Sequence, residues 1–384
     1  MSAATTSPAA PAVDWEVARR RARSLVRPGP RTDRGEAGLL VESLRSAATS
    51  APELVGEVTG LTEAASRSAQ VPLLVVDRGR WIEVNVATFA QVTDGLLPEA
   101  PNRASARMAG EELGLVLPLL ASRVLGQYDP FYGVTSTSGR ASASAPGSGP
   151  GRAPGSDSAP GVGGTGRLLL VAPNVLRVQR QLNLQPADFH LWVGLHEQTH
   201  ALQFAAAPWL AGHLMGMMRE LLGSMLAEDK PSERLRDLLS ALPRAITGEG
   251  GAQGDEPAGA LLGSVMSDHE REMMGKTVAV MSLLEGHADV VMDAVGPQVV
   301  PTVATIRKAF DQRRNSPGLL EGIVRRLMGM DAKLAQYRNG AAFVRAVVDQ
   351  VGHEGLNAVW ADAANLPGSE EIADPAAWLA RVHG

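Results

Sequence analysis

Residues 187–209 read ADFHLWVGLHEQTHALQFAAAPW, and this stretch carries the most informative pattern in the chain. Apolar residues recur through it at helical spacing. Asp188 stands where the N-cap of a helix is expected, and Pro208 marks the far end. The sequence therefore predicts one helix that holds the pentapeptide HEQTH, residues 196–200, near its middle.

The spacing within HEQTH brings two imidazoles together. With about 3.6 residues per turn, His196 and His200 lie one turn apart on the same helix face, so both rings can bind one ion. Glu197 lies about 100° round the helix from His196, which makes it a poor ligand but places it well to take a proton from a metal-bound water. A helical HExxH motif with these roles is typical of zinc hydrolases. His190 and His213 flank the helix, and we expect neither to bind metal.

Catalytic zinc takes three protein ligands, and the third histidine of metzincins is absent because Ala206 occupies its position. The strongest candidate lies in LLEGHADVVMDAVG (283–296), where Glu285 and Asp289 share one helix face. Glu285 can bind the ion while Asp289 accepts a hydrogen bond from a ligating histidine and fixes its tautomer. His287 is the alternative ligand. Because it lies about 200° round the helix from Glu285, we favour Glu285 and expect His287 to line the cleft and to donate a hydrogen bond to substrate.

Composition narrows the class of protein. The 384 residues are 45% hydrophobic and only 4% aromatic, so the core must be built from Leu, Val, Ala and Met, which favours helix. The formal net charge of -5 argues against nucleic-acid binding, and we interpret RRRAR at 19–23 as a solvated helix face. Because the chain has no cysteine, any zinc must be held by His, Asp or Glu.

The N-terminal sequence MSAATTSPAAPAVDW has neither the basic nor the apolar region of a signal peptide. The apolar stretches of the chain are shorter than the ~18 residues that a transmembrane helix needs. A chain without cysteine is also compatible with the cytoplasm. We therefore predict a soluble cytoplasmic protein that contacts no membrane.

Residues 1–12 are rich in Ala, Ser, Thr and Pro, and we expect them to form a disordered tail. Residues 13–384 are expected to form a single domain. Within it, 134–166 is a Ser/Ala/Gly/Pro-rich tract that we interpret as a flexible surface insertion, because compact domains rarely hold so long a structureless loop. The insertion would join two hairpin strands at 128–133 and 167–173; a linker between domains is the alternative.

Helical spacing of apolar residues covers most of the remaining chain. It predicts helices over 14–49 (interrupted at 28–30), 51–68, 81–93 and 108–127, and a nearly continuous helical pattern from Val175 to the C-terminus, broken at Pro208, 247–259, 296–297 and 315–318. LLVVDR at 73–78 forms either a short strand or the lead-in to a helix. The expected fold is mainly α with a small β element.

Five stretches together resemble one known family: LGQYDPF, RLLLVAPNV, HEQTHALQFAAAPWL, LLEGHADVVMDAVGP and QYRNGAAFVRAVVDQVG. They resemble the bacterial zincin-like metallopeptidases of the second zincin-like type, which are often labelled hydrolases or deazaflavin-coenzyme-biosynthesis-associated proteins. The resemblance runs from Asp14 to the C-terminus and skips the 134–166 tract. The coenzyme label finds no counterpart in the residues, because the Gly-rich GVGGTG (161–166) precedes a strand rather than a helix and so is not a phosphate loop.

The resemblance implies a largely helical zincin-like domain whose active helix carries His196, Glu197 and His200. It also implies that Glu285 is the third ligand, because Glu285 and Asp289 reproduce the ExxxD pattern of gluzincins. The sequence departs from thermolysin-like enzymes in the much longer gap between His200 and Glu285.

A tetrahedral intermediate needs a hydrogen-bond donor for its oxyanion. The candidates are Tyr128, Tyr132, Tyr337, His287 and Arg338. We favour Tyr128, which lies in the LGQYDPF stretch.

The sequence thus predicts a zinc metallopeptidase that cleaves a peptide or protein substrate with a zinc-bound water, Glu197 acting as general base. The alternative is a catalytically silent protein in which zinc stabilises the fold for binding or assembly. A helical scaffold without zinc is the third hypothesis. An open fourth coordination position would favour the enzyme over the silent protein.

Overall fold

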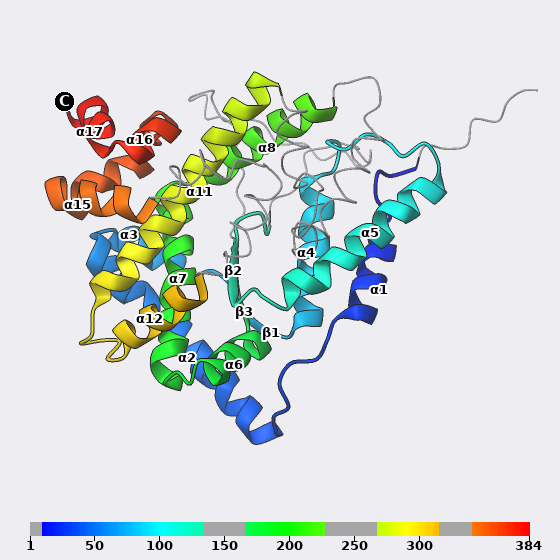
Figure 1. Ribbon diagram of the computed structural model, residues 1–384, viewed down its shortest axis with the longest axis horizontal. Helices are drawn as coiled ribbons and strands as arrows, with labels where there is room; N and C mark the ends of the chain where they lie inside the picture. The colour runs from blue at the N-terminus through cyan, green and yellow to red at the C-terminus, as the bar shows by residue number, and fades with distance from the viewer. Residues whose placement is uncertain (1–9, 134–165, 227–266, 315–339) are drawn as a thin grey trace, which may run out of the picture.

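The computed structural model describes residues 10–133, 166–226, 267–314 and 340–384. Over these residues the fold is mainly helical with a small three-stranded mixed sheet, as the sequence predicts (Figure 1). The predicted insertion, apart from Gly166, lies outside the described residues, and so do Tyr337 and Arg338.

The three strands lie among the helices of the N-terminal half, and from α6 on every described element is a helix. The first elements are α1 (Trp15–Leu25), α2 (Arg34–Thr59), α3 (Thr62–Ser68), β1 (Leu73–Val76), α4 (Arg78–Val92), α5 (Arg103–Ala121), β2 (Gly126–Asp129), β3 (Arg167–Val171) and α6 (Ala172–Gln181). Then follow α7 (Pro186–Ala206), α8 (Leu210–Leu226), α11 (Asp268–Val295), α12 (Val303–Arg314), α15 (Gly340–Leu356), the 3-10 helices η1 (Asn357–Trp360) and η2 (Ala363–Asn365), α16 (Ser369–Ala373) and α17 (Pro375–His383).

The sheet has the order β1-β3-β2, with β1 parallel and β2 antiparallel to the central β3. Successive side chains of a strand point to opposite faces. Leu168 and Leu170 accordingly join a core with α2 and α7, whereas Leu169 and Val171 join a core with α1, α4 and α5. Helices therefore cover both faces of β3, which explains its unbroken apolar sequence. The antiparallel pairing of β2 with β3 confirms the predicted hairpin, but the bounds differ: β2 is Gly126–Asp129 instead of 128–133, and β3 ends at Val171 instead of 173.

The prediction of a helix over 108–127 is wrong at its C-terminal end. α5 ends at Ala121, and Gly126 and Gln127 belong to β2, where Gln127 pairs with Leu169. The pairing with β3 supplies backbone hydrogen bonds that a longer helix would have had to supply itself, and it decides the conformation. LLVVDR is a strand followed directly by the N-cap of α4, since the Asp77 side chain accepts a hydrogen bond from the Arg80 N–H.

The predicted break between 49 and 51 is also absent, because α2 continues through Pro52. A proline inside a helix leaves the carbonyl four residues earlier without its N–H donor. That carbonyl belongs to Ala48, and it accepts a hydrogen bond of 3.0 Å from the Gln198 side chain of α7. A Cβ added to Gly194 would lie 3.1 Å from the Ala47 carbonyl carbon, so α7 crosses α2 closely at this point. The carbonyl that Pro52 leaves free thus joins α2 to α7 by a hydrogen bond.

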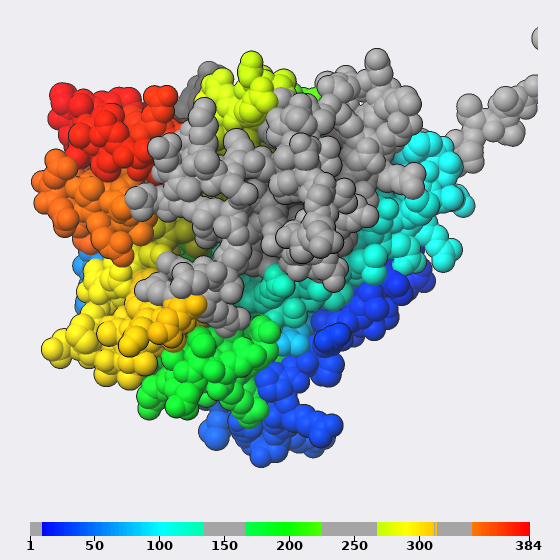
Figure 2. Space-filling model, in the orientation of Figure 1, coloured from blue at the N-terminus to red at the C-terminus, as the bar shows by residue number. Residues whose placement is uncertain are grey.

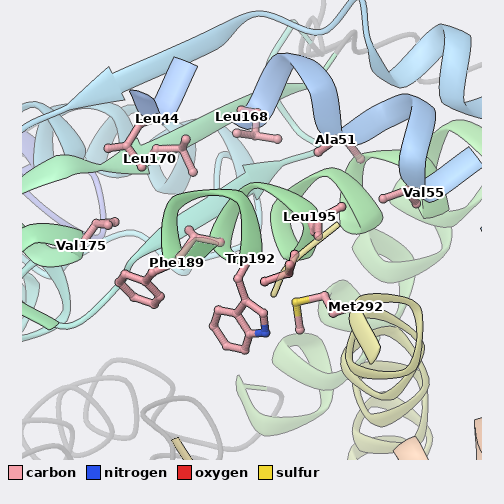
Figure 3. Close-up of a cluster of buried hydrophobic side chains, with 14 of the residues drawn as sticks. Leu44, Ala51, Val55, Leu168, Leu170, Val175, Phe189, Trp192, Leu195 and Met292 are labelled. Atoms are coloured by element: carbon pink, nitrogen blue, oxygen red, sulfur yellow. The ribbon is translucent and has the colours of Figure 1, made fainter. Parts of the chain in front are cut away.

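The largest core lies between the sheet, α2 and α7. Figure 3 shows side chains from α2, β3, α6, α7 and α11 meeting in it, among them Leu44, Leu170, Val175, Phe189 and Met292. A second core packs α11 against α15, α16 and α17. α7 contacts α2, α3, α11 and β2, and it lies at the centre of the largest core (Figure 1).

The two ends of the described chain lie at opposite sides of the molecule (Figures 1 and 2). Ala10 is buried and forms a β-bridge with Ala100, so the tail predicted over 1–12 is ordered at its C-terminal end. The small side chains of Ala10, Ala100 and Ala106 form a cluster of their own, which accounts for this order. Among the described helices, none combines the length and the apolar character needed to cross a membrane.

Candidate metal centre

The helix that carries HEQTH begins at a different N-cap residue from the one the sequence predicts. α7 starts at Pro186 with Gln185 as its N-cap, and the prediction of Asp188 as N-cap is wrong. Asp188 lies in the first turn and accepts hydrogen bonds of 2.8 and 2.6 Å from the Thr302 N–H and hydroxyl. The helix ends at Ala206, before Pro208, as predicted.

His196 and His200 of α7 and Glu285 of α11 bring their ligand atoms together. The two histidine Nε2 atoms lie 3.1 Å apart, and the Glu285 carboxylate oxygens lie 3.6 Å from each of them. A tetrahedral zinc with bonds of about 2.0–2.1 Å holds its ligand atoms about 3.3 Å apart. The donor set therefore fits a zinc ion, which these three side chains would hold.

The second ring nitrogen of His200 faces a protein group. His200 Nδ1 lies 2.9 Å from Gln203 Oε1, and the Gln203 amide in turn donates to the Leu284 carbonyl at 2.8 Å. Near His196 lies Asp289, which accepts a hydrogen bond of 3.0 Å from Arg307. The predicted pair of Glu285 and Asp289 thus lies beside the two histidines.

Burial lowers the pKa of His196 to about 4, and the neighbouring His200 adds to this effect. The negative charges of Glu285 and Asp289 act in the opposite direction, and Arg307 again lowers the pKa. The His196 ring is consequently neutral at pH 7, which is the form that binds metal ions.

Glu197 is only 6% exposed and lies against the edge strand β2. Burial raises its pKa well above the ordinary value and Glu285 adds to the rise, while the backbone N–H of Tyr128 donates to the carboxylate and works the other way. A Cβ added to Gly126 would lie 2.6 Å from Glu197 Oε1. The absent side chain at position 126 thus leaves the room in which this carboxylate sits.

Two of the predicted site side chains lie away from the three ligand atoms. His287 is fully buried: its Nδ1 faces the Gln203 amide at 3.0 Å, and its ring packs on Trp360 with centroids 5.2 Å apart. The Tyr128 hydroxyl lies against Gly166, since a Cβ added there would be 2.1 Å from it, and burial raises the Tyr128 pKa to about 12. Tyr128 reaches Glu197 through its backbone instead.

Tyr132, a predicted candidate, and His190, which we expected not to bind metal, both have contacts outside the metal cluster. The Tyr132 ring is 41% exposed and lies under the Arg167 guanidinium, 4.3 Å from the ring centroid. His190 is buried between the Ser43 hydroxyl at 2.7 Å and the Gln179 side-chain oxygen at 2.9 Å. Neither residue belongs to the metal cluster.

Gln203 and Arg307 contact the site and are absent from the sequence-based prediction. Gln203 follows His200 by three residues and so lies on the same face of α7, a spacing that the sequence does contain. Arg307 comes from α12, and no local pattern links it to Asp289. Only the first of the two could have been found without the structure.

A helical HExxH motif joined by a glutamate from a second helix is the arrangement of zincin-type metallopeptidases. Residues 13–379 match the sequence profile of the zincin-like metallopeptidases, and the chain belongs to this family. The family predicted from the sequence is therefore confirmed.

A crystal structure from Chloroflexus aurantiacus, described as that of a "putative hydrolase with a novel fold", is similar to this chain. The two are 29% identical over 97% of this chain and 99% of the other, with a TM-score of 0.59. Among curated proteins, none matches the chain.

Proposed function

We propose that the protein is a zinc-dependent peptidase in which Glu197 is the general base. The observation that carries this proposal is the convergence of His196, His200 and Glu285 within 3.6 Å, with a buried carboxylate adjacent to them in the motif. Family membership and a likeness to a described hydrolase support it.

Zinc bound by these three residues would polarise the scissile carbonyl and lower the pKa of water. Glu197 takes a proton as the water oxygen attacks the carbonyl carbon, and it passes that proton to the amine nitrogen when the C–N bond breaks. Burial suits it to this role, because a carboxylate with a raised pKa is a stronger proton acceptor. The Tyr128 N–H keeps the carboxylate oriented towards the site.

Asp289 would orient His196 and offset the positive charge that the ion brings. Arg307, which contacts Asp289 and Asp293, holds that carboxylate in place. No substrate contact is proposed for His287, since its side chain has no exposed surface.

The test is hydrolysis of a peptide library by zinc-loaded wild type and by Glu197→Gln. The variant has the same shape but no base, so we expect it to retain zinc and to lose at least about 100-fold in rate. A chelator should abolish the wild-type activity and added zinc should restore it.

Equal rates in wild type and Glu197→Gln would refute the peptidase, because the activity would then come from elsewhere. Zinc that raises the melting temperature without any turnover would favour the silent binding or assembly protein. Purified protein with less than about a tenth of an equivalent of zinc after reconstitution would exclude both.

A further inference from the structure

We propose that Gln203 is a positioning residue that holds His200 in the tautomer presenting Nε2 to the metal ion, and that His287 acts through Gln203. The proposal rests on the metal site of the proposed function. It gives the buried His287 a role that needs no contact with substrate.

The Leu284 backbone carbonyl fixes the orientation of the Gln203 amide. An amide oxygen and nitrogen are distinguished only by their partners, and a carbonyl accepts hydrogen bonds but cannot donate them. The group 2.8 Å from the Leu284 oxygen is therefore the NH2 of Gln203. Gln203 has no exposed surface, so water does not compete for this hydrogen bond.

The amide orientation then determines the tautomer of His200. With its nitrogen on Leu284, Gln203 directs Oε1 at His200 Nδ1, 2.9 Å away. Because Oε1 only accepts, Nδ1 carries the proton and Nε2 keeps its lone pair. That lone pair points into the space shared with His196 and Glu285. The other tautomer would place an N–H where the ion must bind.

His287 receives the second hydrogen of the same NH2 group. Its Nδ1 lies 3.0 Å from Gln203 Nε2, and because an amide NH2 group only donates, Nδ1 is the acceptor. In the described part of the chain, the Nε2 atom of His287 has no hydrogen-bond partner. Its bond to Gln203 is therefore the polar contact that accounts for a histidine at this buried position.

The same amide also joins the two helices that supply the ligands. Gln203 belongs to α7, and the carbonyl that it binds belongs to Leu284 of α11, next to Glu285. A change at Gln203 therefore disturbs both the ring orientation of His200 and the approach of Glu285.

The experiment compares zinc dissociation constants, measured by competition with a chromophoric chelator, and visible spectra of the cobalt-substituted proteins. Gln203→Met keeps the length of the side chain and removes its hydrogen bonds. We expect about 10- to 100-fold weaker zinc binding and an altered cobalt spectrum. The matched control is Gln198→Met, which also removes a buried amide from α7 but loses its bond to Ala48, away from the ligands.

Both variants should unfold at lower temperature than wild type, but Gln198→Met should bind zinc within about threefold of wild type. Equal weakening of zinc binding in both variants would show a loss of fold stability only and would overturn the proposal. So would wild-type affinity and an unchanged cobalt spectrum in Gln203→Met.

One further pair of variants keeps the test decisive if Gln203→Met does not fold. His287→Asn retains an acceptor near the Nδ1 position and should bind zinc more tightly than His287→Leu. The reverse order contradicts the proposal. A wild-type protein that binds no zinc contradicts the proposed function instead.

Discussion

The two helices that supply the metal cluster are held in different ways. α7 is enclosed by α2, α3, α11 and β2, and the side chains of His196 and His200 are only 24% and 14% exposed. α11 packs against α2, α7, α8, α15 and α16, but its ligand Glu285 is 51% exposed. The histidines are placed by the geometry of one helix, whereas the glutamate depends on how a second helix packs.

The largest effect is expected for His196→Ala, which removes one of the two ligands that α7 supplies. With one of two rigidly held ligands gone, we expect less than about a tenth of an equivalent of zinc and no measurable hydrolysis. His213→Ala in α8 removes a histidine that lies against Trp209 and should leave zinc content unchanged. Metal analysis after dialysis checks both, and full zinc content in His196→Ala would contradict the assignment.

On the other helix, Glu285→Gln should weaken zinc binding less than His196→Ala does. The amide retains an oxygen ligand but lacks the negative charge, and a half-exposed position lets water replace it. We expect a loss in zinc affinity of about 10- to 1000-fold. Glu272→Gln, an exposed change on the same helix, is the control. Equal effects of the two variants would mean that Glu285 is not a ligand.

A third change leaves both ligand-bearing helices intact and alters the strand beside α7. In Gly126→Ala the new methyl would lie 2.6 Å from Glu197 Oε1, so the base must move. We expect kcat to fall about 10- to 100-fold with unchanged zinc content. Gly216→Ala on α8, where no atom of the described residues lies within 4 Å of the added Cβ, should be silent. A Gly126→Ala enzyme of normal kcat would show that Glu197 does not need this space.

Within α7 itself, His190 separates fold stability from metal binding. Burial lowers the pKa of His190 from its ordinary value of 6.5 to about 4. Stability from the neutral ring is therefore complete above about pH 6.5 and is lost as the pH falls towards 4. We expect urea unfolding of metal-free wild type to lose about 1–2 kcal/mol more than His190→Asn between pH 7 and pH 5. Parallel pH curves for the two proteins would rule out this role.

The smallest effect is expected for Tyr128→Phe. Tyr128 contacts Glu197 through its backbone N–H, which the substitution retains, and its hydroxyl lies at Gly166. Steady-state kinetics should show a change in kcat of less than about threefold. A loss of 50-fold or more would instead support the hydroxyl as the oxyanion donor.

The sequence predicts most directly the part of the site that one helix determines. His196, Glu197 and His200 follow from the period of a helix alone. Glu285 and Asp289 required a second helix face, and their approach to the histidines depends on the packing of α11 against α7. Residues whose roles come only from tertiary contacts are harder to predict.

The fold shows the same limit at particular residues. Asp188 has the chemistry of an N-cap but serves Thr302 on another segment, and Pro52 has the chemistry of a helix break but lies inside α2. In both cases the hydrogen-bond partner lies far along the chain. Thr302 donates to the Asp188 carboxylate, and Gln198 donates to the carbonyl that Pro52 leaves without its helical N–H. The predicted end of the helix at 127 is wrong for a related reason, because the backbone of Gln127 pairs with β3.

The attachment of Gln198 to the carbonyl freed by Pro52 has an evolutionary consequence. Gln198 occupies a position that the HExxH motif leaves unspecified, so catalysis imposes no choice there. In this chain the choice is imposed by a proline 146 positions earlier, whose missing N–H the glutamine replaces. Positions 52 and 198 should therefore covary among homologues. Chains without proline at position 52 should not require glutamine at position 198.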